Sequence, residues 1–150
     1  MNQKIIIQQA LTESELNSAK EIRQQIFTDE QGIPLHLVED SLNDTAVHVL
    51  VFADMKAIAT ARMFVDEDDE GVIARVAVLT PHRGDGYGKL LVEELIKIAY
   101  QLNLRRITLK PHEHLEKFYS ELGFTTVAGD TEIVGEHLLI TMEKILSDQD

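Results

Sequence analysis

The hydrophobic pattern of the chain predicts a mixed succession of strands and helices. Runs of apolar, β-branched residues predict strands over residues 3–9, 46–53, 57–65, 72–79, 105–110, 124–127 and 133–145. Apolar residues three or four positions apart predict helices over residues 12–28, 88–102 and 112–122. This order indicates the α+β class, and only the strand, helix and strand of residues 72–110 favour parallel pairing.

Polar residues mark where several of these elements begin and end. Thr12 and Glu15 have the spacing of a capping box at the start of the first predicted helix. A turn near Asp54 joins two strands into an antiparallel hairpin, and the acidic run of residues 66–70 connects to the next strand. That run lacks the D-x-D-x-D-G spacing of a calcium loop, which favours a solvated hairpin tip over a metal site.

The segment of residues 29–45 has no clear period. It contains Gly32, Pro34 and five acidic side chains, and we expect a loop with at most one short helix. Loops of this length inside a compact domain are uncommon and are more often functional than not. The segment is therefore a candidate for part of a binding site.

Length and composition predict one domain over residues 1–150. A chain of 150 residues with 44% hydrophobic residues can bury one sizeable core. No apolar run approaches the ~18 to 20 residues of a membrane span, and the N-terminal residues lack a signal peptide's long apolar centre. The absence of cysteine excludes disulfides, thiolate metal sites and a cysteine nucleophile. We expect a cytoplasmic protein with no membrane partner.

The formal net charge of −12 argues against nucleic acid as a partner, because binding to a phosphate backbone depends on clustered Lys and Arg. The charge is compatible with a cationic or amine ligand, although an acidic balance is also a common route to solubility. Basic residues do gather at one place, around a glycine-rich stretch that contains His82, Arg83 and Lys89.

This stretch, VAVLTPHRGDGYG at residues 76–88, joins a strand to a helix and has the outline of a phosphate-binding loop. A Walker A loop fails, because its first glycine would fall on Arg83 and the residue after Lys89 is Leu90. A dinucleotide fingerprint that starts at Gly84 also fails, because its third glycine would fall on Lys89. An ordinary glycine-rich connection stays open as an alternative for the loop taken alone.

The spacing Arg83-x-x-Gly86-x-Gly88 after a hydrophobic strand resembles the pyrophosphate loop of the GNAT N-acetyltransferase superfamily. Residues 118–124, FYSELGF, resemble the segment in which these enzymes end their last long helix and enter the next strand. The N-terminal part is similar to the ElaA/YjcF-like branch, through Arg23, Ile26-Phe27, Glu30-Gln31, Pro34, Glu39-Asp40, Asp44 and His48.

The resemblance implies a GNAT fold, a mixed twisted sheet of about six or seven strands flanked by about four helices, with acetyl-CoA as cosubstrate and no metal. In this fold the strand before the loop separates from its parallel neighbour and leaves a gap for the pantetheine arm. The backbone of Ala77, Val78 and Leu79 would contact that arm, and the N–H of Val78 would polarise the thioester. The pyrophosphate would lie on the backbone of Arg83, Gly84, Asp85, Gly86, Tyr87, Gly88 and Lys89.

The resemblance also implies roles in catalysis. Tyr119 corresponds to the tyrosine that protonates the departing thiolate, although an ordinary core tyrosine is an alternative. Glu30, Glu39 and His48 are candidates for the general base, and each of them could instead be a solvated or capping residue. An alkyl amine has a pKa of about 10.4, so it must lose a proton before it can attack near neutrality.

His112 stands where many GNAT proteins have an asparagine that contacts the cofactor, seven residues before the tyrosine. It is therefore included among the cofactor-binding candidates as a substitute hydrogen-bond partner. Zinc binding by His112 and His114 is disfavoured, because residues two apart on a helix do not face the same way. His137 is expected to be structural or to line the acceptor site.

These observations predict an enzyme that moves an acetyl group from acetyl-CoA to a primary amine by direct attack. The amine would belong to a small molecule, a lysine side chain or a peptide N-terminus, and a homodimer stays open. The alternative from another class is a catalytically silent module that binds or senses acyl-CoA. The two differ at Tyr119 and in residues 30–48.

Overall fold

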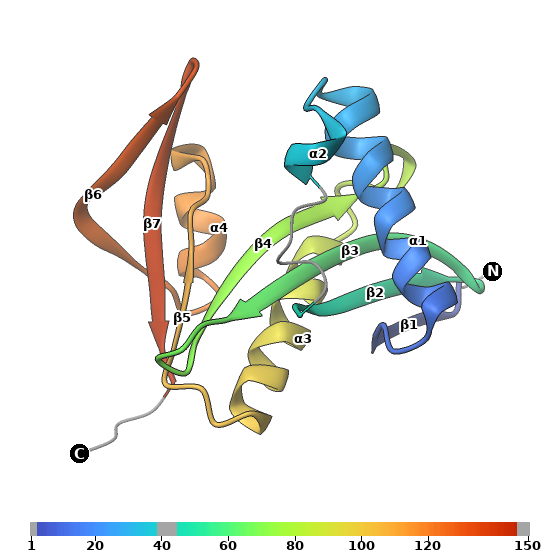
Figure 1. The fold of residues 1–150 in the computed structure, drawn as a ribbon, viewed down its shortest axis with the longest axis horizontal. Helices are drawn as coiled ribbons and strands as arrows, with labels where there is room; N and C mark the ends of the chain where they lie inside the picture. Colours follow the sequence, from blue (N-terminus) through green and yellow to red (C-terminus); the bar gives the residue numbers. More distant parts are fainter. Residues whose placement is uncertain (1–2, 39–44, 147–150) are drawn as a thin grey trace.

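The computed structural model describes residues 3–38 and 45–146, and their strands form one seven-stranded sheet (Figure 1). The spatial order is β1-β2-β3-β4-β5-β7-β6, and all neighbours are antiparallel except β4 and β5. The strands are β1 (Ile5–Gln9), β2 (Val47–Ala53), β3 (Lys56–Val65), β4 (Glu70–Val78), β5 (Arg106–Leu109), β6 (Thr125–Val134) and β7 (His137–Ile145).

The first helix starts where the sequence predicts and then changes its geometry. In the capping box of α1 (Glu13–Arg23), Thr12 Oγ1 accepts a hydrogen bond from Glu15 N–H at 3.1 Å. From η1 (Gln24–Glu30) the helix is of the π type, with Gln31 N–H bonded five residues back to Ile26. The other helical elements are α2 (Leu35–Val38), the 3₁₀ turns η3 (Thr80–His82) and η4 (Glu113–Leu115), α3 (Tyr87–Gln101) and α4 (Glu116–Ser120).

Two apolar clusters cover the two faces of the sheet. The larger one packs α3 through Leu91 and Leu95 against β2, β3 and β5, and the smaller one packs α1 and η1 through Ile22 and Ile26 against Leu50 of β2. Burial of these side chains is the main favourable term that holds the layers together. No helix in the described part of the chain is both long enough and apolar enough to cross a membrane.

The single parallel contact of the sheet is short. Strands β4 and β5 pair only at Glu70, Gly71 and Val72, which lie opposite residues 106–108. Beyond that point β4 continues to Val78 while β5 ends at Leu109, and the two strands diverge (Figure 1). A bulge in β4 lies in the divergent part, where Arg75 has a left-handed backbone with φ of 57°. The expected separation of the two parallel strands is therefore confirmed.

The C-terminal part departs most from the sequence-based expectation. The predicted strands at 124–127 and 133–145 are instead a long hairpin, β6 and β7, that turns at residues 135 and 136. The strand character of residues 128–132 was missed because β6 is an exposed edge strand with a polar sequence and no apolar alternation. The predicted helix 112–122 is shorter, since a 3₁₀ turn precedes the five residues of α4.

Candidate functional site

A cavity of about 640 Å³ occupies the gap between the diverging strands. Its walls are residues 72–76 of β4 and residues 109–112 at the end of β5. The remaining lining comes from η1 and α2, from η4 and α4, and from the β6–β7 hairpin: Phe27, Gln31, Ile33, Leu37, Val38, Leu115, Tyr119, Glu132, Val134 and Leu139. The sheet, both sets of short helices and the hairpin therefore all contribute to one site.

The cavity is lined mainly by apolar side chains, with a few polar ones among them. The described lining carries the cations Arg75 and Lys110, the carboxylate Glu132, and the imidazole of His112. Arg75 Nη2 donates to the carbonyl of Leu37 at 3.0 Å, which ties β4 to α2 across one wall. The whole chain is strongly acidic, but the described residues that line this cavity include more cations than carboxylates.

The glycine-rich loop lies at the end of β4 and opens into α3. Gly84 and Gly86 have φ of 88° and 85°, a left-handed conformation that glycine adopts without steric cost. Gly86 is the N-cap of α3 and supplies no side chain to the first helical turn. The N–H groups of that turn therefore lack helical acceptors and can bind an anion, helped by the helix dipole. The predicted order of strand, glycine turn and helix is confirmed.

Arg83 is turned back toward the protein. Its own N–H bonds to the carbonyl of Thr80 at 3.2 Å, and its Nε donates to the carbonyl of Val78 at 2.8 Å. Its Nη2 lies 3.2 and 3.3 Å from the two carboxylate oxygens of Glu30. Thr80 Oγ1 also donates to Glu30, at 3.2 Å. The loop N–H groups that remain for an anion therefore begin after Arg83.

The backbone groups at the end of β4 point alternately to its two edges. Leu79 N–H bonds to the carbonyl of Ile58 on β3 at 2.9 Å, and the carbonyl of Leu79 accepts from His82 N–H. Successive residues of a strand direct their backbone groups to opposite edges, so Val78 N–H points away from β3. Ala77 lies opposite Thr60 of β3 and its side chain is buried in the smaller core. Of the three residues expected at the pantetheine arm, Val78 directs its N–H away from β3, while Leu79 directs its N–H to β3.

Tyr119 lies in α4 and faces the cavity. Its side chain packs edge-on against Phe118 and Phe124, with ring centroids 4.9 and 6.0 Å away, and the residue is only 7% exposed. Burial raises the pKa of its phenol above the usual value of 10, because a phenolate would be poorly solvated there. The hydroxyl carries its proton at neutral pH, as an exposed tyrosine also does, and burial makes it a weaker acid.

His112 lines the cavity just before η4 and belongs to a group of three imidazoles. Its ring centroid is 4.7 Å from that of His137 and 5.6 Å from that of His114. Burial, followed by the charges of His137 and His114, lowers the pKa of His112 below the usual 6.5. Contact between His112 and His137 requires the bridge between residues 112 and 139, which no local sequence pattern encodes.

The two described candidates for the general base, Glu30 and His48, are not among the residues that line the cavity. Glu30 contacts Arg83 and Thr80 instead, and Glu39 lies outside the described residues. His48 is 3% exposed, and its Nδ1 lies 3.2 Å from Nη1 of buried Arg23. A guanidinium can only donate, so Nδ1 is the acceptor in a hydrogen bond between the two side chains. This arrangement favours a structural role for His48.

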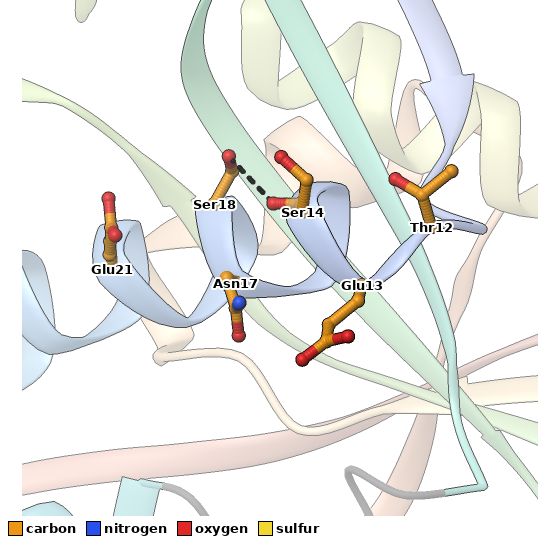
Figure 2. Close-up of a pocket in the computed structure, with 6 residues that line it drawn as sticks. All are labelled: Thr12, Glu13, Ser14, Asn17, Ser18 and Glu21. Atoms are coloured by element: carbon orange, nitrogen blue, oxygen red, sulfur yellow. Dashed lines mark hydrogen bonds between the residues drawn. The ribbon is translucent and has the colours of Figure 1, made fainter.

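A second concavity, on the outer surface of α1, offers no comparable chemistry (Figure 2). One helix and its cap supply all of the lining, which consists of Thr12, Glu13, Ser14, Asn17, Ser18 and Glu21. The hydrogen bond drawn there, from Ser18 Oγ to the Ser14 carbonyl at 3.2 Å, lies within the helix. Within residues 3–38 and 45–146, no group of three or more Asp, Glu or His side chains is placed to hold a metal ion.

Comparison with known proteins agrees with this geometry. Residues 11–124 match the family described as Acetyltransferase (GNAT) family. The chain belongs to the GNAT acetyltransferase family. Enzymes of this family use an acyl-CoA cosubstrate and transfer the acyl group to amines. The seven-stranded sheet with its helices is the α+β GNAT fold, as expected from the sequence.

Relatives of this GNAT protein include members of the expected branch. The uncharacterized N-acetyltransferase YjcF of Bacillus subtilis is 26% identical over 119 residues, which cover 79% of this chain and 84% of YjcF. The crystal structure of Escherichia coli ElaA superposes with a TM-score of 0.80 at 23% identity, over 95% of this chain and 99% of ElaA. An aminoglycoside 6′-N-acetyltransferase complexed with coenzyme A has the same fold, with a TM-score of 0.76 at 15% identity, over 97% and 99% of the two chains.

We expect the His112 group to make the folded protein sensitive to mild acid. Because the pKa of His112 is lowered in the folded state, the unfolded chain takes up the proton first as the pH falls through 6.5. Stability should therefore decrease from pH 7 toward pH 5. In an NMR titration His112 should have its midpoint below 6.5, and His137→Asn should raise it more than His114→Asn does. A midpoint that His137→Asn leaves unchanged would contradict the contribution of the His137 charge and leave burial as the cause.

Proposed function

We propose that this protein is an N-acetyltransferase that moves an acetyl group from acetyl-CoA to a primary amine by direct attack, without an acyl-enzyme. The observation that carries the proposal is the gap between β4 and β5, together with the uncapped N-terminus of α3 that follows β4 in a chain of the GNAT family. A cavity of about 640 Å³ is large enough for a pantetheine arm and an acceptor amine.

In this proposal the backbone holds the cosubstrate. The N–H groups from Gly84 to Lys89 bind the pyrophosphate, and the pantetheine arm lies along β4 in the gap. The N–H of Val78 donates to the thioester carbonyl and then to the oxyanion that develops when the amine attacks. The complex of coenzyme A with an aminoglycoside 6′-N-acetyltransferase of the same fold supports the choice of cosubstrate.

Transfer forms a bond between the amine nitrogen and the acetyl carbon and breaks the bond from that carbon to sulfur. Tyr119, which is protonated at neutral pH, donates its proton to the departing thiolate and then recovers one from solvent. The amine loses one proton during attack. Among the described residues that line the cavity, the neutral imidazole of His112 and the carboxylate of Glu132 can accept it, directly or through water.

The acceptor in this proposal is a small molecule, a lysine side chain or an N-terminal amine. A panel of such amines tests it, with free CoA as the readout after acetyl-CoA has been found to raise the melting temperature. A silent acyl-CoA-binding module would show the shift in melting temperature without amine-dependent release of CoA. Absence of both effects would exclude either function.

The loop assignment predicts that Gly86→Ala weakens acetyl-CoA binding at least about tenfold, or 1.4 kcal/mol. A Cβ at φ of 85° strains the N-cap and displaces the N–H groups that receive the pyrophosphate. Gly129→Ala is the matched control, because Gly129 has a similar φ of 78°, equally open surroundings and a place on the distant β6. Isothermal titration of both variants should separate them, and equal affinities would argue against the loop as the binding site.

The acid assignment predicts that Tyr119→Phe lowers turnover about 10²- to 10⁴-fold while acetyl-CoA still binds. The ring that packs against Phe118 and Phe124 is kept, and the described residues make no hydrogen bond to the hydroxyl, so stability should change little. Steady-state kinetics across pH provide the test. A Phe variant with full activity and the parent's pH profile would show that Tyr119 is not the acid.

A further inference from the structure

Glu30, Thr80 and Arg83 form a contact that joins η1 to the glycine-rich loop. Glu30 and Arg83 are 53 positions apart in the sequence. Glu30 at the end of η1 binds Nη2 of Arg83 through both oxygens and also accepts from Thr80 Oγ1. Arg83 Nε donates at the same time to the carbonyl of Val78, at 2.8 Å. The planar guanidinium therefore connects a carboxylate on one element with a backbone carbonyl on another.

This contact acts on Val78, whose amide points away from β3. In an extended strand, the N–H and C=O of one residue point to the same edge. Fixing the carbonyl of Val78 therefore also restricts the direction of Val78 N–H. Leu79 is fixed from the other edge by Ile58 of β3, so Val78 is held between two sets of hydrogen bonds.

We propose that Glu30 and Arg83 are positioning residues that aim Val78 N–H at the thioester carbonyl, Arg83 through its bond to Val78 and Glu30 through Arg83. This inference rests on the proposed acetyl transfer. Arg83 does not bind the pyrophosphate, which the backbone N–H groups after it receive. Glu30 is not the general base, because both of its oxygens are engaged by Arg83 and Thr80.

Two rival roles make different predictions. If Arg83 binds pyrophosphate in competition with Glu30, Arg83→Met weakens CoA binding and Glu30→Ala strengthens it. If Glu30 is the base, Glu30→Ala changes the pH profile of turnover regardless of Arg83. If Glu30 and Arg83 are positioning residues, both variants bind CoA with an affinity within about threefold of the parent's. Both then reduce the polarisation of the thioester carbonyl.

The experiment uses the full chain and [1-¹³C]acetyl-CoA, with the variants Arg83→Met, Glu30→Ala and their combination. The ¹³C signal of the bound thioester carbonyl reports polarisation by Val78 N–H and needs no amine acceptor. In the parent we expect this signal to lie downfield of its position in free acetyl-CoA. Arg83→Met should abolish most of this displacement, and Glu30→Ala should abolish a smaller part of it. The double variant should match Arg83→Met, because Glu30 acts only through Arg83.

Controls separate this effect from charge and from folding. Arg105→Met and Glu93→Gln remove equal charges at exposed sites outside the contact, and they should leave the carbonyl signal unchanged. Arg83→Lys keeps the positive charge, but an ammonium group cannot reach the Val78 carbonyl and the Glu30 carboxylate as the planar guanidinium does. Its carbonyl signal should therefore match that of Arg83→Met. The side chains of Arg83 and Glu30 are 44% and 35% exposed, and half-exposed ion pairs contribute little to stability, so all variants should fold.

Each remaining outcome decides one of the two proposals. An unchanged carbonyl signal in Arg83→Met, or an effect of Glu30→Ala that persists in the Arg83→Met background, overturns the positioning role. If the parent does not bind acetyl-CoA, the proposed function fails and the positioning role fails with it, and only the hold of Arg83 and Glu30 on the Val78 carbonyl is left to test without ligand. The ¹⁵N signal of Leu79, whose peptide unit contains the Val78 carbonyl, should then move in Arg83→Met and Glu30→Ala but not in the controls.

Discussion

The separation of β4 from β5 after only three paired residues is the constraint on which the rest of the structure depends. A sheet interior normally satisfies its backbone groups on both sides of every strand. Here the far half of β4 has β3 on one side and a cavity on the other. The sheet is completed instead by β7, which pairs with β5 and brings the β6–β7 hairpin to the opposite wall. Short helical segments then close the gap from both faces.

Local sequence patterns were enough to predict the parts of the site that lie within one strand, turn or helix. Gly84 and Gly86 stand out because only glycine adopts their backbone conformation without strain, and the apolar face of α3 follows from a period of three and four. The cavity-facing Tyr119 was assigned through its neighbours in the motif. Each of these signals spans fewer than about twenty residues and needs no knowledge of tertiary contacts.

The contacts that cross the sheet could not be predicted in this way. The approach of His137 to His112 depends on the bridge at Leu139, and the contact of Glu30 with Arg83 depends on how η1 packs over the end of β4. The change from α to π geometry after Arg23 leaves the same apolar spacing in the sequence, so periodicity cannot separate the two helix types. Net charge says nothing about the lining of the cavity, because charge is a property of the whole surface.

The hydrogen bonds at the end of β4 affect how the sequence of such a protein can change in evolution. At Val78 and Leu79 the groups that matter are backbone atoms, which every residue except proline supplies in full. Side chains there are free to change with the core around them, provided that the strand keeps its register with β3. Homologues can therefore differ widely in sequence along this strand while keeping the same backbone hydrogen bonds. Changes in the lining side chains, by contrast, would alter the shape and polarity of the cavity.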